Sequence, residues 1–172
     1  MSQQQTEQNM TAIRCAARFC NTMRSADTME RDEFLRETAA SLAELYLFFV
    51  SLPENNGLPG NMFAPQRMDY VDEDFYNAIR LKAEIQLGPD DTYLETFEED
   101  MKYSDTPVGA SVSESLADIF QPVFNFLCSV RESDGDTLAE DIADCKEKFD
   151  EYWSQTLVNV MRPINKLLHH PN

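Results

Sequence analysis

The sequence has few of the residues on which most enzymes and nucleic-acid-binding proteins depend. It contains 2 histidines, 5 glycines and 1 tryptophan, and its 14 basic side chains are outnumbered by 31 acidic ones. The scarcity of glycine and the lack of strand-like alternation argue against an all-β fold rich in tight turns. A formal net charge of −17 repels phosphate backbones, and no basic patch offsets it. We therefore expect no nucleic-acid partner.

Long apolar runs and paired cysteines are also missing. The longest apolar candidate, LAELYLFFV at residues 42–50, is about half the roughly 18 residues that span a bilayer. The start, MSQQQTEQNM, lacks the basic residues and apolar run of a secretory signal. The cysteines lie in apolar segments without a C-x-x-C pair, which is typical of buried thiols in a reducing compartment: Cys15, Cys20, Cys128 and Cys145. We expect a cytoplasmic location and no membrane partner.

The residues that are present predict a helical domain. A hydrophobic content of 42% with 10% aromatics in 172 residues is enough for one globular core. Apolar side chains at helical spacing predict helices over residues 8–24, 32–51 and 72–87, then through LADIFQPVFNFLCSV and from 138 to 167. The prediction is an all-α single domain over 1–172, a bundle of about five main helices with mostly antiparallel neighbours. Residues 1–7 are expected to fray.

Local signals mark where these helices begin, end and bend. Serine or threonine precedes glutamate by three residues, the spacing of a capping box, at Thr92 and Glu95, Ser111 and Glu114, and Thr137 and Glu140. The first of these pairs predicts a short helix in TYLETFEED. Gly88 and Pro89 predict the end of the third helix, whereas Pro122 and Pro163 lie inside helices and predict bends.

A long loop is predicted at about residues 52–70. Prolines, glycines and an Asn-Asn-Gly turn signal interrupt any helix there. Loops of this length are uncommon in compact domains and are often functional. Met62 and Phe63 lie near its middle, and the sequence leaves three alternatives for them: they anchor a partner, fold back onto the core, or are disordered.

The most ordered charge pattern lies on the last predicted helix. Glu140, Asp144, Glu147 and Glu151 are spaced by three or four residues and so form one stripe, which we call the acidic stripe. Lys148 lies one turn from both Asp144 and Glu151 and partly neutralises it. The stripe is either a solvated face, a docking surface for a basic protein partner, or a divalent-cation site.

The C-terminal stretch FDEYWSQTLVNVMRPINKLLHH is a candidate functional site because it holds the only tryptophan and both histidines of the chain. Phe149, Trp153 and Leu157 advance by fours, which favours a core face and makes Trp153 a core residue. His169 and His170 are adjacent at a helix end without a nearby acid, so we expect no metal there. The chain has neither a Gly-x-Ser-x-Gly motif nor a glycine-rich phosphate loop. We predict no catalytic residue and no cofactor.

Three stretches together resemble a known family. They are YNAIRLKAEIQLGPDDTYLETF, SVSESLADIFQPVFNFL and CKEKFDEYWSQTLVNVMRPINKL. Within them, the segment from Ser115 to Phe120 and the Phe149-x-x-x-Trp153 spacing resemble the bacterial helical family known as domain of unknown function 5063, over roughly residues 35–168. The chain departs from the family pattern at Pro122 and Pro163, and at Ser154, where the pattern has glycine. The resemblance implies an all-α bacterial cytoplasmic domain and brings no activity, cofactor or catalytic residue.

Two hypotheses follow. The leading one is a non-enzymatic, acidic cytoplasmic protein that acts through protein contacts, as a monomer or a homodimer, using the acidic stripe and the 52–70 loop. The alternative is a small-molecule-binding protein or enzyme with a pocket between the bent helices near Tyr152 and Trp153.

Overall fold

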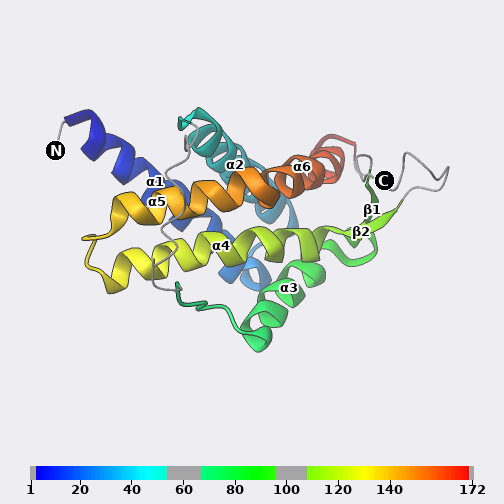
Figure 1. Ribbon diagram of the computed structural model, residues 1–172. Helices are drawn as coiled ribbons and strands as arrows, with labels where there is room; N and C mark the ends of the chain where they lie inside the picture. The colour runs from blue at the N-terminus through cyan, green and yellow to red at the C-terminus, as the bar shows by residue number, and fades with distance from the viewer. Residues whose placement is uncertain (1–2, 54–66, 96–107, 171–172) are drawn as a thin grey trace.

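The computed structural model describes residues 3–53, 67–95 and 108–170, and it is a bundle of helices with one short hairpin of strands (Figure 1). In chain order its elements are α1 (Gln3–Arg24), η1 (Ala26–Thr28), α2 (Arg31–Ser51), α3 (Glu73–Leu87), η2 (Gly88–Asp91), β1 (Thr92–Leu94), β2 (Gly109–Ser111), α4 (Val112–Glu132), α5 (Leu138–Lys148), a π-helical turn η4 (Phe149–Trp153) and α6 (Ser154–His169). The all-α fold predicted from the sequence is confirmed, with α5, η4 and α6 together forming the predicted fifth helix.

Helix α4 lies at the centre of the bundle. It packs against α1, α3, α5 and α6, as expected for a helix that is apolar on most of its surface. A turn at 133–137 reverses the chain, so that α5 and α6 run back along α4 (Figure 1). Asp134 and Gly135 take positive φ angles of 52° and 84° in this turn, which explains the glycine. Antiparallel pairing of these helices follows from the short connection.

The inner face of α5, η4 and α6 is the apolar row that the sequence predicted. Phe149, Trp153 and Leu157 are each at most 2% exposed. The Trp153 ring packs edge-on against Phe149 and against Phe49 of α2, with centroids 4.7 Å and 5.2 Å away. Edge-to-face pairs of this kind stabilise a core beyond their buried area. Trp153 is therefore a core residue, as predicted.

Side chains cap the starts of α3 and α4, and the cap at Ser111 is the one that the sequence predicted. The Asp72 side chain accepts a hydrogen bond of 2.8 Å from the Phe75 amide at the start of α3. Ser111 accepts one of 3.2 Å from the Glu114 amide at the start of α4. The capping box predicted at Thr137 is wrong, because Thr137 makes no cap bond and its hydroxyl donates to Asp141 instead. At the other end of α3, Gly88 has φ 55° and ends the helix as predicted.

The short helix predicted in TYLETFEED is wrong over its described residues, because 92–94 form strand β1. The strand pairs antiparallel with β2, with Tyr93 opposite Ala110. Tyr93 is 7% exposed, whereas Leu94 beside it is 56% exposed, so the strand buries one face. The next strand along the chain, β2, supplies the backbone hydrogen bonds that a helix otherwise makes within itself, and this outweighs the weak capping signal.

Other differences concern helix ends and regularity. Helix α1 begins at Gln3, so residues 3–7, which were expected to fray, are helical. Neither Pro122 nor Pro163 ends its helix. The helix formed by α5 and α6 also contains the π turn η4, which widens it around Trp153. None of the helices described is long and apolar enough to cross a membrane.

Candidate functional site

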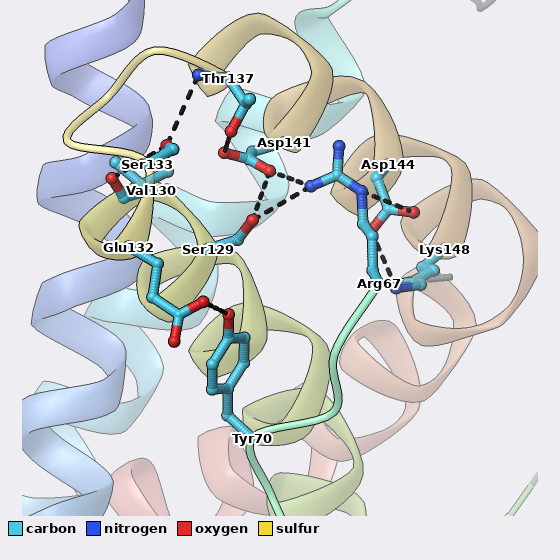
Figure 2. A network of polar contacts seen from close by, with 10 residues as sticks. All are labelled: Arg67, Tyr70, Ser129, Val130, Glu132, Ser133, Thr137, Asp141, Asp144 and Lys148. Atoms are coloured by element: carbon cyan, nitrogen blue, oxygen red, sulfur yellow. Dashed lines mark hydrogen bonds and ion pairs between the residues drawn. The ribbon is translucent and has the colours of Figure 1, made fainter. Parts of the chain in front are cut away.

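The most connected polar site is built around Asp141, in the first turn of α5. This carboxylate is 1% exposed, although it lies only four residues after the surface turn. It accepts hydrogen bonds from Ser129 Oγ of α4 at 2.7 Å and from Thr137 Oγ1 at 2.9 Å (Figure 2). It also forms an ion pair with Arg67. A buried carboxylate needs such partners because isolated burial of its charge is very unfavourable.

Arg67 approaches from the end of the predicted loop and joins two acids of α5. Its Nη1 atom contacts Asp141 and donates to Ser129 Oγ at 3.3 Å. Its Nε atom lies 3.7 Å from Asp144 Oδ1, and Lys148 Nζ donates to the other oxygen of Asp144 at 2.8 Å (Figure 2). Two acids and two bases thus form one network, in which the charges cancel.

The residues after Arg67 are fixed to α4 by a second set of hydrogen bonds. Asp69 accepts from Asn125 Nδ2 at 3.0 Å and from Gln121 Nε2 at 2.9 Å, and the Tyr70 amide donates to Asn125 Oδ1 at 2.9 Å. Burial opposes ionisation of Asp69, but the bonds from Asn125, the Val71 amide and Gln121 together outweigh it and lower its pKa.

Tyr70 extends this set toward the end of α4. Its hydroxyl donates to Glu132 (Figure 2), and this bond is the largest cause that raises the pKa of Tyr70 to about 12. The C-terminal end of the loop is therefore held firmly against α4 and α5.

The structure divides the acidic stripe. Asp144 is drawn into the network with Arg67 and Lys148, which confirms that Lys148 partly neutralises the stripe. Glu140, Glu147 and Glu151 are exposed, and among the residues that the structure describes none of the three has a hydrogen-bonding or ionic partner. The free part of the stripe, which we call the acidic face, consists of these three glutamates.

The two surfaces expected from the sequence meet at Arg67. Met62 and Phe63 lie outside the described residues, so their positions are not assigned. The described end of the same loop contacts Asp141 and Asp144, on the helix that carries the acidic face. Sequence reasoning missed Arg67 and Asp141, and the buried Asp141 had no signal in the sequence beyond its place near a turn.

Tyr152 and Trp153, near which the sequence placed a possible pocket, lie in different surroundings. Trp153 is 0% exposed and is surrounded by aromatic rings, whereas Tyr152 is 45% exposed. The Trp153 Nε1 atom and the Thr38 hydroxyl are buried without a hydrogen-bond partner among the described residues. The space that the sequence assigned to a ligand is filled by Phe49 and Phe149.

Lys146 is a third charged residue that sequence reasoning missed. It is 4% exposed, forms an ion pair with Asp150 one turn later, and lies 5.7 Å above the Phe149 ring. The spacing of four residues between Lys146 and Asp150 was the available signal. Lys146 covers the aromatic core with its stem and directs its charge to the surface.

The remaining candidate groups are dispersed. The described part of the chain contains no cluster of three or more His, Cys, Asp or Glu side chains that can hold a metal ion. His169 and His170 are exposed at the end of α6. All four cysteines are free thiols, and burial raises the pKa of Cys15 to about 11 and that of Cys145 further. A thiol with a raised pKa is a poor nucleophile at neutral pH.

The fold and the site define an all-α domain whose polar network joins a loop to two helices. The chain belongs to the family described as Domain of unknown function (DUF5063), whose model matches residues 4–170. It is similar to the crystal structure of protein BF1032 from Bacteroides fragilis, with a TM-score of 0.76 and 27% sequence identity over 95% of this chain and 93% of that chain. A search of curated proteins finds no match.

Proposed function

We propose that this protein is a non-enzymatic, cytoplasmic interaction domain that binds a basic protein segment through its acidic face. The observation that carries the proposal is the exposure of Glu140, Glu147 and Glu151 on the outer side of α5 and η4. Asp144 pairs with Lys148 and Arg67, whereas these three glutamates have no ionic partner among the described residues. Three uncompensated carboxylates on one rigid helical face attract a cationic partner and orient it.

Two further features support the proposal. The formal net charge of −17 steers basic partners toward the protein over a longer range than any single contact. The Arg67 network holds the end of the 52–70 loop beside the same helix. A partner at the acidic face therefore meets the base of this loop, and we propose Met62 and Phe63 as its apolar anchors.

The test compares two variants with the same change in charge. One replaces the acidic face (Glu140→Gln, Glu147→Gln, Glu151→Gln), and the control replaces exposed acids of α2 and α3 (Asp32→Asn, Glu33→Gln, Glu73→Gln). Quantitative affinity capture from the native cell at low and moderate salt is followed by titration of a synthetic peptide from the basic region of the captured protein.

We expect the acidic-face variant to bind the peptide about tenfold more weakly, and the control to change by less than about threefold, because only local charges act through physiological salt. Equal loss in both variants contradicts a defined docking face, since general charge then explains the binding. Capture of nothing above background at either salt concentration contradicts the proposal as a whole.

A further inference from the structure

A cavity of about 440 Å³ lies between α6 and the segment formed by η2 and β1. Helix α5, which carries Asp141 and Asp144, lies toward the other end of the bundle from β1 (Figure 1). Pro89, Tyr93 and Leu94 line one side, and Pro163 and Leu167 line the other. The alternative hypothesis placed a pocket between the bent helices near Tyr152 and Trp153. This cavity is a different one, because it lies beside Pro163, faces β1 and has neither of those residues in its lining.

Two cations lie at this cavity. Arg162 and Lys166 are one helical turn apart on α6 and both belong to its lining. Arg162 donates to the carbonyl oxygen of Leu94, which fixes the guanidinium between α6 and β1. Lys166 is exposed, and no residue in the described ranges pairs with its ammonium group. One donor is therefore held in place and another is available to a ligand.

Asp90, the acid in the lining, does not pair with Lys166. Asp90 already forms an ion pair with Arg31 of α2, with an N–O distance of 2.6 Å. The Tyr93 hydroxyl already has hydrogen-bond partners, since it donates to Glu95 Oε1 at 3.0 Å and lies 3.2 Å from Ser115 Oγ. Lys166 therefore contributes an unpaired positive charge to the lining among the residues that the structure describes. With a screening length of about 8 Å at physiological salt, such local charges dominate over the distant acids.

We propose that this cavity binds a small organic anion. Its apolar body packs against Tyr93, Leu94 and Leu167, and its carboxylate or phosphate lies between Arg162 and Lys166. The cavity volume lies within the range of about 300–1,000 Å³ that is usual for small-molecule sites, and charge-assisted hydrogen bonds are the strong, orienting contacts of such sites. The proposal is independent of the acidic face.

The test uses three ligands that share one apolar chain. Sodium hexanoate, hexyl phosphate and 1-hexanol are titrated into the ¹⁵N-labelled protein, and the amide signals of Tyr93, Leu94, Lys166 and Leu167 are followed. We expect both anions to shift these signals and hexanol to shift them weakly. Tighter binding of hexyl phosphate with a steeper salt dependence identifies phosphate as the preferred group, and tighter binding of hexanoate identifies carboxylate.

Three variants complete the test. Lys166→Gln is expected to weaken anion binding about fivefold to tenfold, whereas Arg36→Gln, which removes an exposed cation outside the cavity lining, changes it by less than about twofold. Thr92→Trp fills the rim from an exposed strand position and abolishes the shifts. Equal shifts with hexanol, equal effects of the lysine and arginine substitutions, or unchanged signals with both anions each overturn the proposal.

Discussion

Arg67 and Asp141 are 74 residues apart in the chain and form an ion pair that joins the end of the 52–70 loop to the first turn of α5. The carboxylate is fully buried at its side chain, whereas the arginine side chain is 33% exposed. Arg67 therefore compensates, from the protein surface, the negative charge of a buried carboxylate. Replacing Arg67 and replacing Asp141 should lower the free energy of unfolding by different amounts.

Replacing Arg67 by methionine leaves the Asp141 charge buried with only two hydroxyl donors. We expect the free energy of unfolding to fall by about 2–4 kcal/mol, somewhat less than for a fully buried pair because Arg67 is partly solvated. Asp141→Asn keeps the shape and removes the charge, and the double variant should cost clearly less than the sum of the two single variants. Urea denaturation of all four proteins measures this coupling, and additive costs show that the pair is not coupled.

Trp153 gives a second prediction because its Nε1–H group is buried without a partner among the described residues. Trp153→Ala should cost about 3–5 kcal/mol through the cavity that it leaves. Trp153→Phe keeps an aromatic ring and removes the unpaired donor, so its cost should be about 1–2 kcal/mol. Thermal unfolding followed by circular dichroism compares the two. Similar costs for both variants show that the indole donor is satisfied in solution.

The two helix-interior prolines should respond differently to alanine. Pro163 is half-buried, so Pro163→Ala mainly restores a backbone donor and should stabilise α6 by about 1–2 kcal/mol, part of the roughly 3 kcal/mol by which alanine exceeds proline in a helix. Pro122 is buried against the core, and loss of its ring offsets the same gain. Melting temperatures distinguish these outcomes. A stability loss in Pro163→Ala shows that α6 is adapted to its proline.

The lowered pKa of Asp69 predicts that the stability of the protein depends on pH. Its folded-state pKa lies below the ordinary value of 3.8, so its contribution to stability is present above that value and is lost as pH falls toward the folded pKa. Asp69→Asn should lower the stability at pH 7 by about 1 kcal/mol, since it weakens hydrogen bonds from Asn125 and Gln121 at a largely exposed site.

Comparing the stability of the native protein and Asp69→Asn at acid pH tests whether ionisation of Asp69 stabilises the fold. The difference between the native protein and Asp69→Asn should narrow as pH falls from about 5 to below 3.8, because the native carboxyl then binds a proton too. Urea denaturation at a series of pH values measures it. A difference that stays constant over this range shows that Asp69 does not gain from ionisation in the fold.

Much of the fold could be predicted because the signals are local and repeated. The spacing of Phe149, Trp153 and Leu157 indicates one buried helical face, and all three lie in the core. Ser111 and Gly88 mark a helix start and a helix end where the structure has them. Thr137 misled the prediction because its hydroxyl has a stronger partner in the buried Asp141.

The candidate site was predicted less completely. The acidic stripe was found from its spacing, but its division into a paired Asp144 and free glutamates depends on Arg67. No local pattern indicates that Arg67 reaches α5, because the contact closes a long stretch of chain. The cavity at Pro163 was likewise invisible, since β1, which faces it, pairs with a strand from a separate segment.

The sequence by itself determined the helical class, the core position of Trp153 and the acidity of the surface. These features depend on side-chain periodicity and composition, which are properties of neighbouring residues. Only the tertiary structure decided that Asp141 is buried, that 92–94 form a strand, and that Arg162 and Lys166 lie beside a cavity. Each of these depends on contacts between distant segments, whose partners no local pattern specifies.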